Sequence, residues 1–118
     1  MTLEECYEKL NGDYSDVKSR LMSDSLIERF LLKYPDDKTM DELCEAVAAG
    51  DIREAFSAVH TIKGLALNLA LSGLYRDAYE LTEQLRSRDM QADKRLFENV
   101  KQSHQLVLDT IAAYKAEK

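Results

Sequence analysis

The stretch over residues 59–69, VHTIKGLALNL, combines a histidine, a lysine and a glycine at spacings that could serve chemistry. Residues three and four apart are neighbours on a helix surface, so Lys63 and Gly64 would lie one turn from His60. A neutral imidazole is a nucleophile, and a nearby ammonium could neutralise a phosphoryl group attached to it. Gly64 would leave the imidazole uncrowded, which offsets the cost of about 1 kcal/mol that glycine carries inside a helix. This arrangement suits a histidine that receives and passes on a phosphoryl group.

A helix through this stretch would have two different faces. Small and aliphatic residues fall on the side opposite His60 and suit packing within a bundle; they are Ala55, Ala58, Ile62, Leu65, Ala66 and Leu69. Phe56 and Leu67 flank His60, Lys63 and Gly64 on the near side. Because the opposite stripe is the more apolar one, we expect the His60 face to be at least partly exposed, with Phe56 and Leu67 forming an apolar patch on it.

Each of these residues also has an ordinary structural interpretation. A single histidine on a helix is more often a surface or half-buried residue without chemistry. Gly64 could let a neighbouring helix pack closely, and Lys63 could belong to a solvated face. Phe56 and Leu67 could pack against short N-terminal helices. The spacing by itself leaves these alternatives open.

Helical periodicity runs through almost the whole chain, and no segment alternates in the manner of a strand. We expect short helices over about residues 2–10 and from residue 15 onwards. A third helix would begin at Ser23 and end at Pro35, which cannot continue it. The inward side of this third helix would carry Leu26, Ile27, Phe30 and Leu31.

Four longer helices complete the predicted fold. A capping box that begins at Thr39 would open the next helix, and Gly50 would close it. Asp51 would start the helix that carries the histidine motif, and two more helices would cover about residues 74–87 and 93–115. Their apolar stripes are Leu74, Ala78, Leu81 and Leu85, then Leu96, Val100, Leu106 (or Val107) and Ile111. The pattern predicts one all-α domain over residues 1–118, an antiparallel up-and-down four-helix bundle with one or two short additional N-terminal helices.

Composition narrows the possible functions. The chain has 118 residues, of which 45% are hydrophobic and 32% charged, as is ordinary for a globular domain. Its net charge of −6 disfavours nucleic acid and anionic membranes as partners. The N-terminus lacks a hydrophobic signal core, and no apolar run approaches the roughly 20 residues that span a bilayer. Cys6 and Cys44 form no CxxC pattern and are interpreted as free thiols, so we expect a cytoplasmic protein.

The segment HTIKG at residues 60–64, followed by Asn68 and Leu69, resembles the HxxKG signature of histidine-containing phosphotransfer (HPt) domains. The upstream segment LNGDYSDVKSRL resembles the short helix, turn and amphipathic helix with which the family begins. The downstream segment GLYRDAYELTEQLR resembles its next bundle helix. The resemblance therefore covers nearly the whole chain.

This resemblance implies a four-helix bundle that relays phosphoryl groups between aspartates of response-regulator receiver domains in a two-component phosphorelay. His60 would be the phosphorylated residue, Lys63 the neighbour of the phosphate and Gly64 the residue that permits close approach. Phe56 and Leu67 would form the apolar docking patch. A receiver domain or hybrid histidine kinase would supply the Mg²⁺ and most catalytic groups, so the chain would need no cofactor and would not itself be an enzyme. We expect a monomer, because the histidine must stay accessible.

The sequence departs from the family pattern at three positions. Leu67 stands where relatives often have a small residue, and Ala70 stands where they usually have glycine. Thr82 takes the place of a glutamine or glutamate that, in some relatives, holds the other nitrogen of the imidazole. Its hydroxyl could do the same with a shorter reach. The bulky Leu67 concerns docking geometry and partner choice more than phosphorylation.

Other classes of function remain open. The bundle could be a degenerate member of the family, an adaptor that binds a receiver or another partner without being phosphorylated. A metal or redox site would have to use His60, His104, Cys6 and Cys44, whose spacing fits no known ligand pattern. His104 has no lysine and glycine beside it and is expected to be exposed on the last helix. The sequence has neither a glycine loop for phosphate nor a nucleophile elbow, so it gives no indication of a self-contained enzyme.

Overall fold

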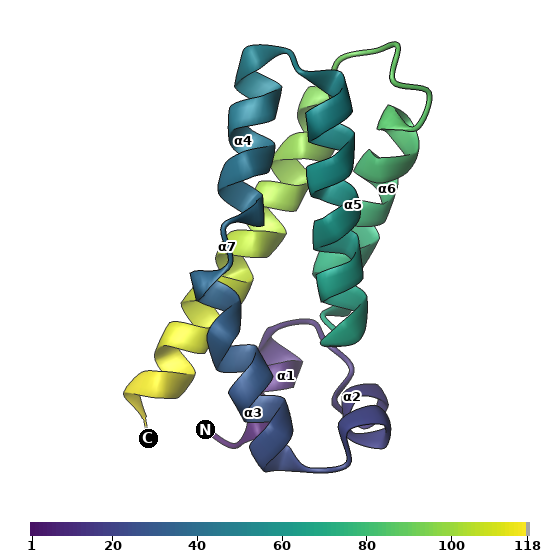
Figure 1. Ribbon diagram of the computed structural model, residues 1–118. Coiled ribbons are helices and arrows are strands. Elements are labelled where there is room, and N and C mark those ends of the chain that lie inside the picture. Colours follow the sequence, from purple (N-terminus) through teal and green to yellow (C-terminus); the bar gives the residue numbers. More distant parts are fainter. Residues whose placement is uncertain (118) are drawn as a thin grey trace.

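Four helices run alternately up and down and form an antiparallel bundle (Figure 1). They belong to a computed structural model that describes residues 1–117. The four helices are α4 (Thr39–Ala49), α5 (Ile52–Asn68), α6 (Ser72–Leu85) and α7 (Lys94–Ala116). Helix α5 packs on α4 and on α6, and α6 packs on α7. The described residues contain no strand, so the predicted all-α class and the up-and-down bundle are confirmed.

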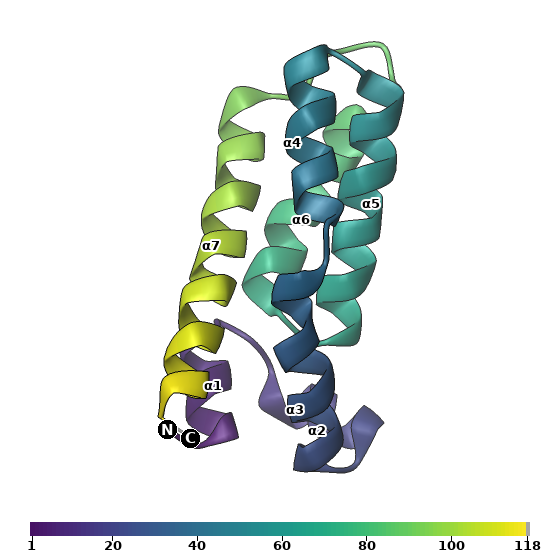
Figure 2. The same ribbon diagram turned by 60° about the vertical axis from the view of Figure 1, so that its left-hand side comes forward.

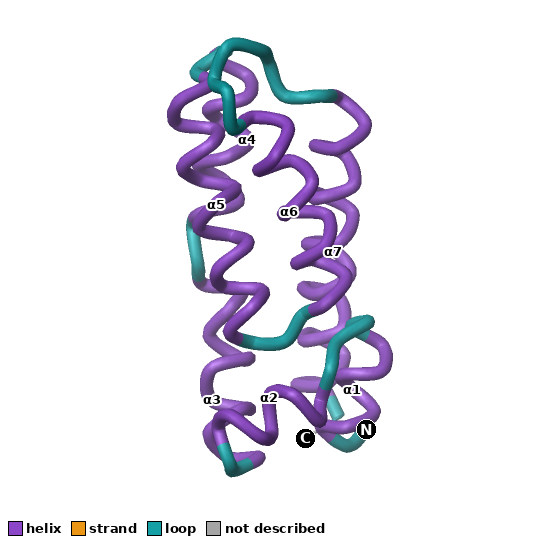
Figure 3. The backbone as a smooth tube through the Cα atoms, turned by 90° about the vertical axis from the view of Figure 1, so that its right-hand side faces the viewer, coloured by secondary structure: helices purple, strands orange, loops and turns teal. Residues whose placement is uncertain are grey.

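Short elements precede the bundle and close one of its ends. They are α1 (Leu3–Lys9), α2 (Tyr14–Leu21), α3 (Asp24–Lys33) and the 3₁₀-helix η1 (Tyr34–Asp36). Helix α3 lies end to end with α4 in two views, so α3 and α4 form one interrupted rod (Figures 1 and 2). Helices α1 and α2 are the additional N-terminal helices. The loop that joins α6 to α7 lies at the opposite end of the bundle (Figure 3).

Local capping explains where most helices begin and end. The Asp51 side chain accepts a hydrogen bond of 3.1 Å from the Glu54 amide at the start of α5. Gly50 ends α4 with φ of 72°, a conformation that favours glycine. The capping box predicted at Thr39 is wrong, because Thr39 already lies in the helix and its amide donates to the Asp37 carboxylate at 2.8 Å.

The core follows the predicted apolar stripes closely. The stripe of α5 opposite His60 is buried except for Leu65, which is half-buried, and the whole predicted stripe of α6 is buried. Of the predicted stripe of α7, Val100 and Ile111 are buried and Leu96 is half-buried. Of the two alternatives for its third position, Val107 is buried and Leu106 is exposed. The prediction that Phe30 faces inward is wrong, because Ile27 and Leu31 fill the inner side of α3. Phe30 lies at the border of that side and is 43% exposed.

The two cysteines do not form a disulfide. Cys6 and Cys44 are free thiols, as predicted. Cys6 is buried, which raises the pKa of its thiol to about 11. Within residues 1–117, every helix is too short or too polar to cross a lipid bilayer.

Candidate functional site

His60 lies near the middle of α5 on a side that faces solvent. Its side chain is exposed, so the predicted exposure of this face is confirmed. Within the described residues the imidazole has no hydrogen bond and no ion pair. Its ring stacks on Phe56, with ring centroids 5.9 Å apart and planes at 6°. Both ring nitrogens are therefore available to a reacting group, and the ring has a fixed support one turn away.

Phe56 is less accessible than the sequence suggested. The side chain was expected on an exposed patch, but the residue is only 9% exposed. The guanidinium carbon of Arg88 lies 4.2 Å from the centre of the Phe56 ring, and that of Arg86 lies 5.7 Å away. Both arginines come from the end of α6 and the loop after it, some thirty positions along the chain from Phe56. Cation–π contacts thus cover a ring that local periodicity places on the surface.

Gly64 faces open space. A Cβ atom added at this position would meet no atom of a neighbouring element within 4 Å. The interpretation that Gly64 lets another helix pack closely is therefore wrong. The absence of a side chain leaves room one turn from His60 that no part of the bundle uses, as an approaching partner would require.

Lys63 lies toward α6. Its ammonium is 5.6 Å from the centre of the Tyr79 ring, and the residue is half-buried. Glu83 lies farther along the same side, where a hydrogen bond from Arg86 lowers the pKa of its carboxyl group and the charge of Lys63 adds to this effect. Lys63 therefore extends from the His60 face toward α6, on a long flexible side chain.

Leu67 is exposed two turns beyond His60 on the same helix. More than half of the residue is accessible, at 52%. An apolar pocket lies nearby, between α5 and the N-terminal helices; Leu21 and Phe30 line one side, and Leu65 and Leu69 line the other. Leu67 does not line this pocket. Of the two residues predicted for the docking patch, the structure exposes Leu67 but not Phe56.

Two departures from the family pattern have clear structural consequences. Ala70 has φ of 54°, in the left-handed region where glycine is favoured, so this turn carries backbone strain. Thr82 is fully buried, and its hydroxyl donates a hydrogen bond of 2.6 Å to the Ala78 carbonyl. The expectation that Thr82 could hold the imidazole is wrong, because its proton is already bound to the backbone inside the core.

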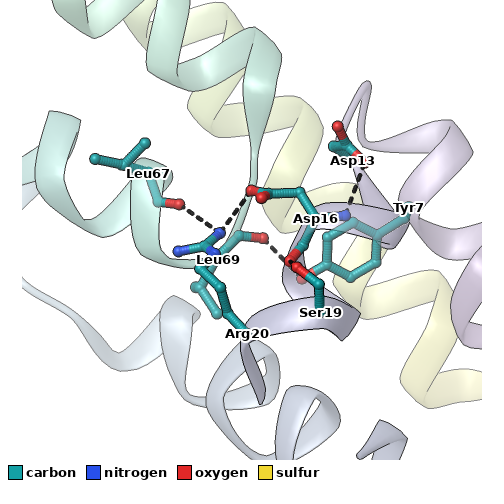
Figure 4. A network of polar contacts seen from close by, with 7 residues as sticks. All are labelled: Tyr7, Asp13, Asp16, Ser19, Arg20, Leu67 and Leu69. Carbon is teal, nitrogen blue, oxygen red and sulfur yellow. Dashed lines mark hydrogen bonds and ion pairs between the residues drawn. The ribbon is translucent and has the colours of Figure 1, made fainter. Parts of the chain in front are cut away.

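Helices α1 and α2 fix the end of α5 (Figure 4). The last carbonyls of a helix lack partners within it and must find donors elsewhere. The Tyr7 hydroxyl donates to the Leu69 carbonyl at 2.9 Å, and Arg20 donates to the Leu67 carbonyl at 2.9 Å and to the Asp16 carboxylate at 2.8 Å. No local pattern indicated the two contacts with the end of α5, because they join residues 47 and 62 positions apart.

Tyr7→Phe should destabilise the protein by about 1–2 kcal/mol, because it removes the donor of a buried carbonyl. Tyr14→Phe is the matched control, since the Tyr14 hydroxyl donates to Asp24 in an exposed position where water can replace it. That loss should stay below about 0.5 kcal/mol. Urea unfolding of both variants measures the two free energies. Equal losses would contradict the role given to the Tyr7 hydrogen bond.

His104 lies outside this site. It was expected to be exposed, but it is half-buried, and its Nδ1 atom shares a hydrogen bond of 2.7 Å with the Tyr34 hydroxyl. Burial lowers the pKa of His104, against an opposing effect of Asp41 and Asp37. Within residues 1–117 there is no group of three or more histidine, cysteine, aspartate or glutamate side chains that could hold a metal ion. The four residues considered for a metal or redox site therefore do not come together.

Most of the chain is similar to one known protein family. Residues 25–116 match the family model described as Hpt domain. No curated protein and no solved structure shows significant similarity to the chain. The matched range includes His60, Lys63 and Gly64 and the four bundle helices, whereas α1 and α2 precede it.

Proposed function

Because the chain belongs to the Hpt domain family, we propose that it relays phosphoryl groups between aspartates of response-regulator receiver domains in a two-component phosphorelay. The accepting residue in this proposal is His60. The observation that carries the proposal is an exposed imidazole without polar partners in the described chain, next to the open space over Gly64. A buried ring would not be free to meet a second protein.

The proposed transfer needs a nucleophile from this chain and most other groups from its partner. A neutral imidazole nitrogen of His60 attacks the phosphorus of the receiver's aspartyl phosphate. The N–P bond forms, the P–O bond to the aspartate breaks, and the aspartate carboxylate leaves with the electron pair. The reverse reaction returns the phosphoryl group to a receiver. The Mg²⁺ of the receiver would neutralise the charge of the transferring group, so this chain acts as a carrier rather than as an enzyme.

Docking of the receiver would use the apolar surface at Leu67. Leu67→Gln should lower the apparent affinity for a receiver about tenfold, equivalent to about 1.4 kcal/mol of lost apolar contact. Phosphorylation of the variant by phosphoramidate, a small donor, should stay unchanged because it needs no docking surface. The rate of transfer at varied receiver concentration measures the effect. Leu106→Gln is the control, since Leu106 is an exposed leucine of α7, and equal effects of the two substitutions would exclude this docking role.

A phosphotransfer screen tests the proposed function against the adaptor alternative. Purified receivers are phosphorylated with radioactive label and mixed with this protein, and a cognate receiver should pass its label to the chain. An adaptor would bind a receiver and yet accept no label from it or from phosphoramidate. Binding without labelling, with receivers known to be active, would therefore replace the relay by the adaptor.

The setting of the relay is also part of the proposal. We propose that this domain works as a monomer in the cytoplasm. Its partners would be receiver domains and hybrid histidine kinases, and it would bind neither nucleic acid nor membranes. The free thiols Cys6 and Cys44 support a reducing compartment. A monomer is also supported by the position of Leu67 on the His60 face, because self-association through Leu67 would cover that face.

A further inference from the structure

A shallow hollow lies beside His60 and is lined by arginines that the signature does not include. We call it the arginine hollow; its lining residues are Arg53, Phe56, Ser57, His60 and Arg88. Arg53 lies in α5, two turns before His60, and Arg88 lies in the loop between α6 and α7. Lys63 does not line the hollow. The positive charges that line the hollow beside the imidazole are thus arginines from two different elements.

These two arginines have no acidic partner among the described residues. Within residues 1–117, neither Arg53 nor Arg88 forms a hydrogen bond or an ion pair with a carboxylate, although the chain as a whole has a net charge of −6. Arg86 differs, because it donates two hydrogen bonds to Glu83, at 2.8 and 2.5 Å. An unpaired guanidinium keeps all its donors free for an anion.

Arg88 and His60 both contact the ring of Phe56. The guanidinium carbon of Arg88 lies 4.2 Å from the centre of the Phe56 ring, and that ring stacks in parallel on His60. Phe56 thus lies in contact with both side chains, and its own ring is buried. A guanidinium matches the geometry of phosphate oxygens and can donate to two of them at once.

We propose that Arg53 and Arg88 bind the phosphoryl group once it is attached to His60. This assignment rests on the proposed function and adds two residues to the site, with a phosphoryl dianion as their ligand. Arg88 would leave the Phe56 ring, or tilt on it, to donate to the phosphoryl oxygens, and Arg53 would approach them from the preceding turns of α5. The arginines would favour the doubly charged phosphoryl group over its protonated form.

Phosphoramidate provides the direct test, because it phosphorylates without a receiver. The imidazole nitrogen attacks phosphorus, the P–N bond of the donor breaks, and ammonia leaves with the proton of the imidazole. The titration of the phosphorus NMR signal then reports the pKa of the phosphoryl group on His60. In the variant that carries both Arg53→Gln and Arg88→Gln, this pKa should rise by about one pH unit, because two cations no longer favour the dianion.

Arg86→Gln is the matched control, since Arg86 also contacts Phe56 but is already paired with Glu83. Its titration should stay close to that of the wild-type protein, and thermal unfolding should confirm that all variants are folded. If the double variant is phosphorylated and titrates like the wild type, the arginines do not bind the phosphoryl group and the assignment is wrong. If the wild-type protein itself takes no phosphoryl group, the proposed function fails first.

Discussion

Replacing His60 with glutamine should abolish phosphoryl acceptance from every donor. Glutamine has no nucleophilic nitrogen, because its amide lone pair is delocalised, and the other histidine of the chain lies in α7, outside this site. The His60 ring is exposed and lacks hydrogen bonds within the described chain, so the substitution should leave the fold intact. Incorporation of labelled phosphoryl groups from a receiver and from phosphoramidate measures the loss.

His104→Gln is the control for this experiment. His104 is half-buried and bound to Tyr34, so its loss should change stability but leave phosphoryl acceptance at the level of the wild type. Thermal unfolding of both variants separates a folding defect from a loss of the nucleophile. Label that persists after His60→Gln would place the accepting group elsewhere in the chain.

A larger residue at position 64 should slow phosphoryl transfer from a receiver without destabilising the fold. Gly64→Ala should stabilise the protein by about 1 kcal/mol, because alanine has the higher helix propensity and its Cβ would meet open space. Gly64→Leu should also fold well, yet it should slow transfer from a receiver on the order of 10²-fold, because it displaces the partner from the reacting geometry. Phosphorylation by phosphoramidate should change far less, since that donor is small.

A substitution on another side of the same helix provides the comparison. Thr61 is exposed and lies about 100° around α5 from His60, so Thr61→Leu adds similar bulk away from the reacting face. Denaturant unfolding and receiver-dependent transfer are measured for all three variants. A loss of stability in Gly64→Leu would indicate that the glycine serves packing after all. Unchanged transfer in Gly64→Leu would show that the open space has no role in docking.

Periodicity predicted most of the fold because helix cores depend on short-range spacing. The buried stripes of α5 and α6 follow directly from apolar residues three and four apart, and exposure of His60 follows from the stripe opposite it. Gly50 and Asp51 were placed correctly since caps depend on neighbouring residues. The motif residues His60, Lys63 and Gly64 could be identified as site candidates because they too lie at short spacing within one helix.

The remaining features depend on contacts between distant parts of the chain. Phe56 is covered by Arg86 and Arg88, and His104 is half-buried against Tyr34, although both look like surface residues within their own helices. Arg53 and Arg88 were missed as parts of the site, because Arg88 lies in a loop. The position of Arg53, two turns before the histidine on the same helix, was the local signal available.

The most direct test is a chase from the phosphorylated protein to a receiver. The protein is labelled on His60, freed of donor and mixed with an unphosphorylated cognate receiver and Mg²⁺. We expect the label to leave His60 and appear on the receiver's aspartate faster than it is lost to water. If the label is lost only as free phosphate, with no receiver gaining it, the exposed histidine is not a relay.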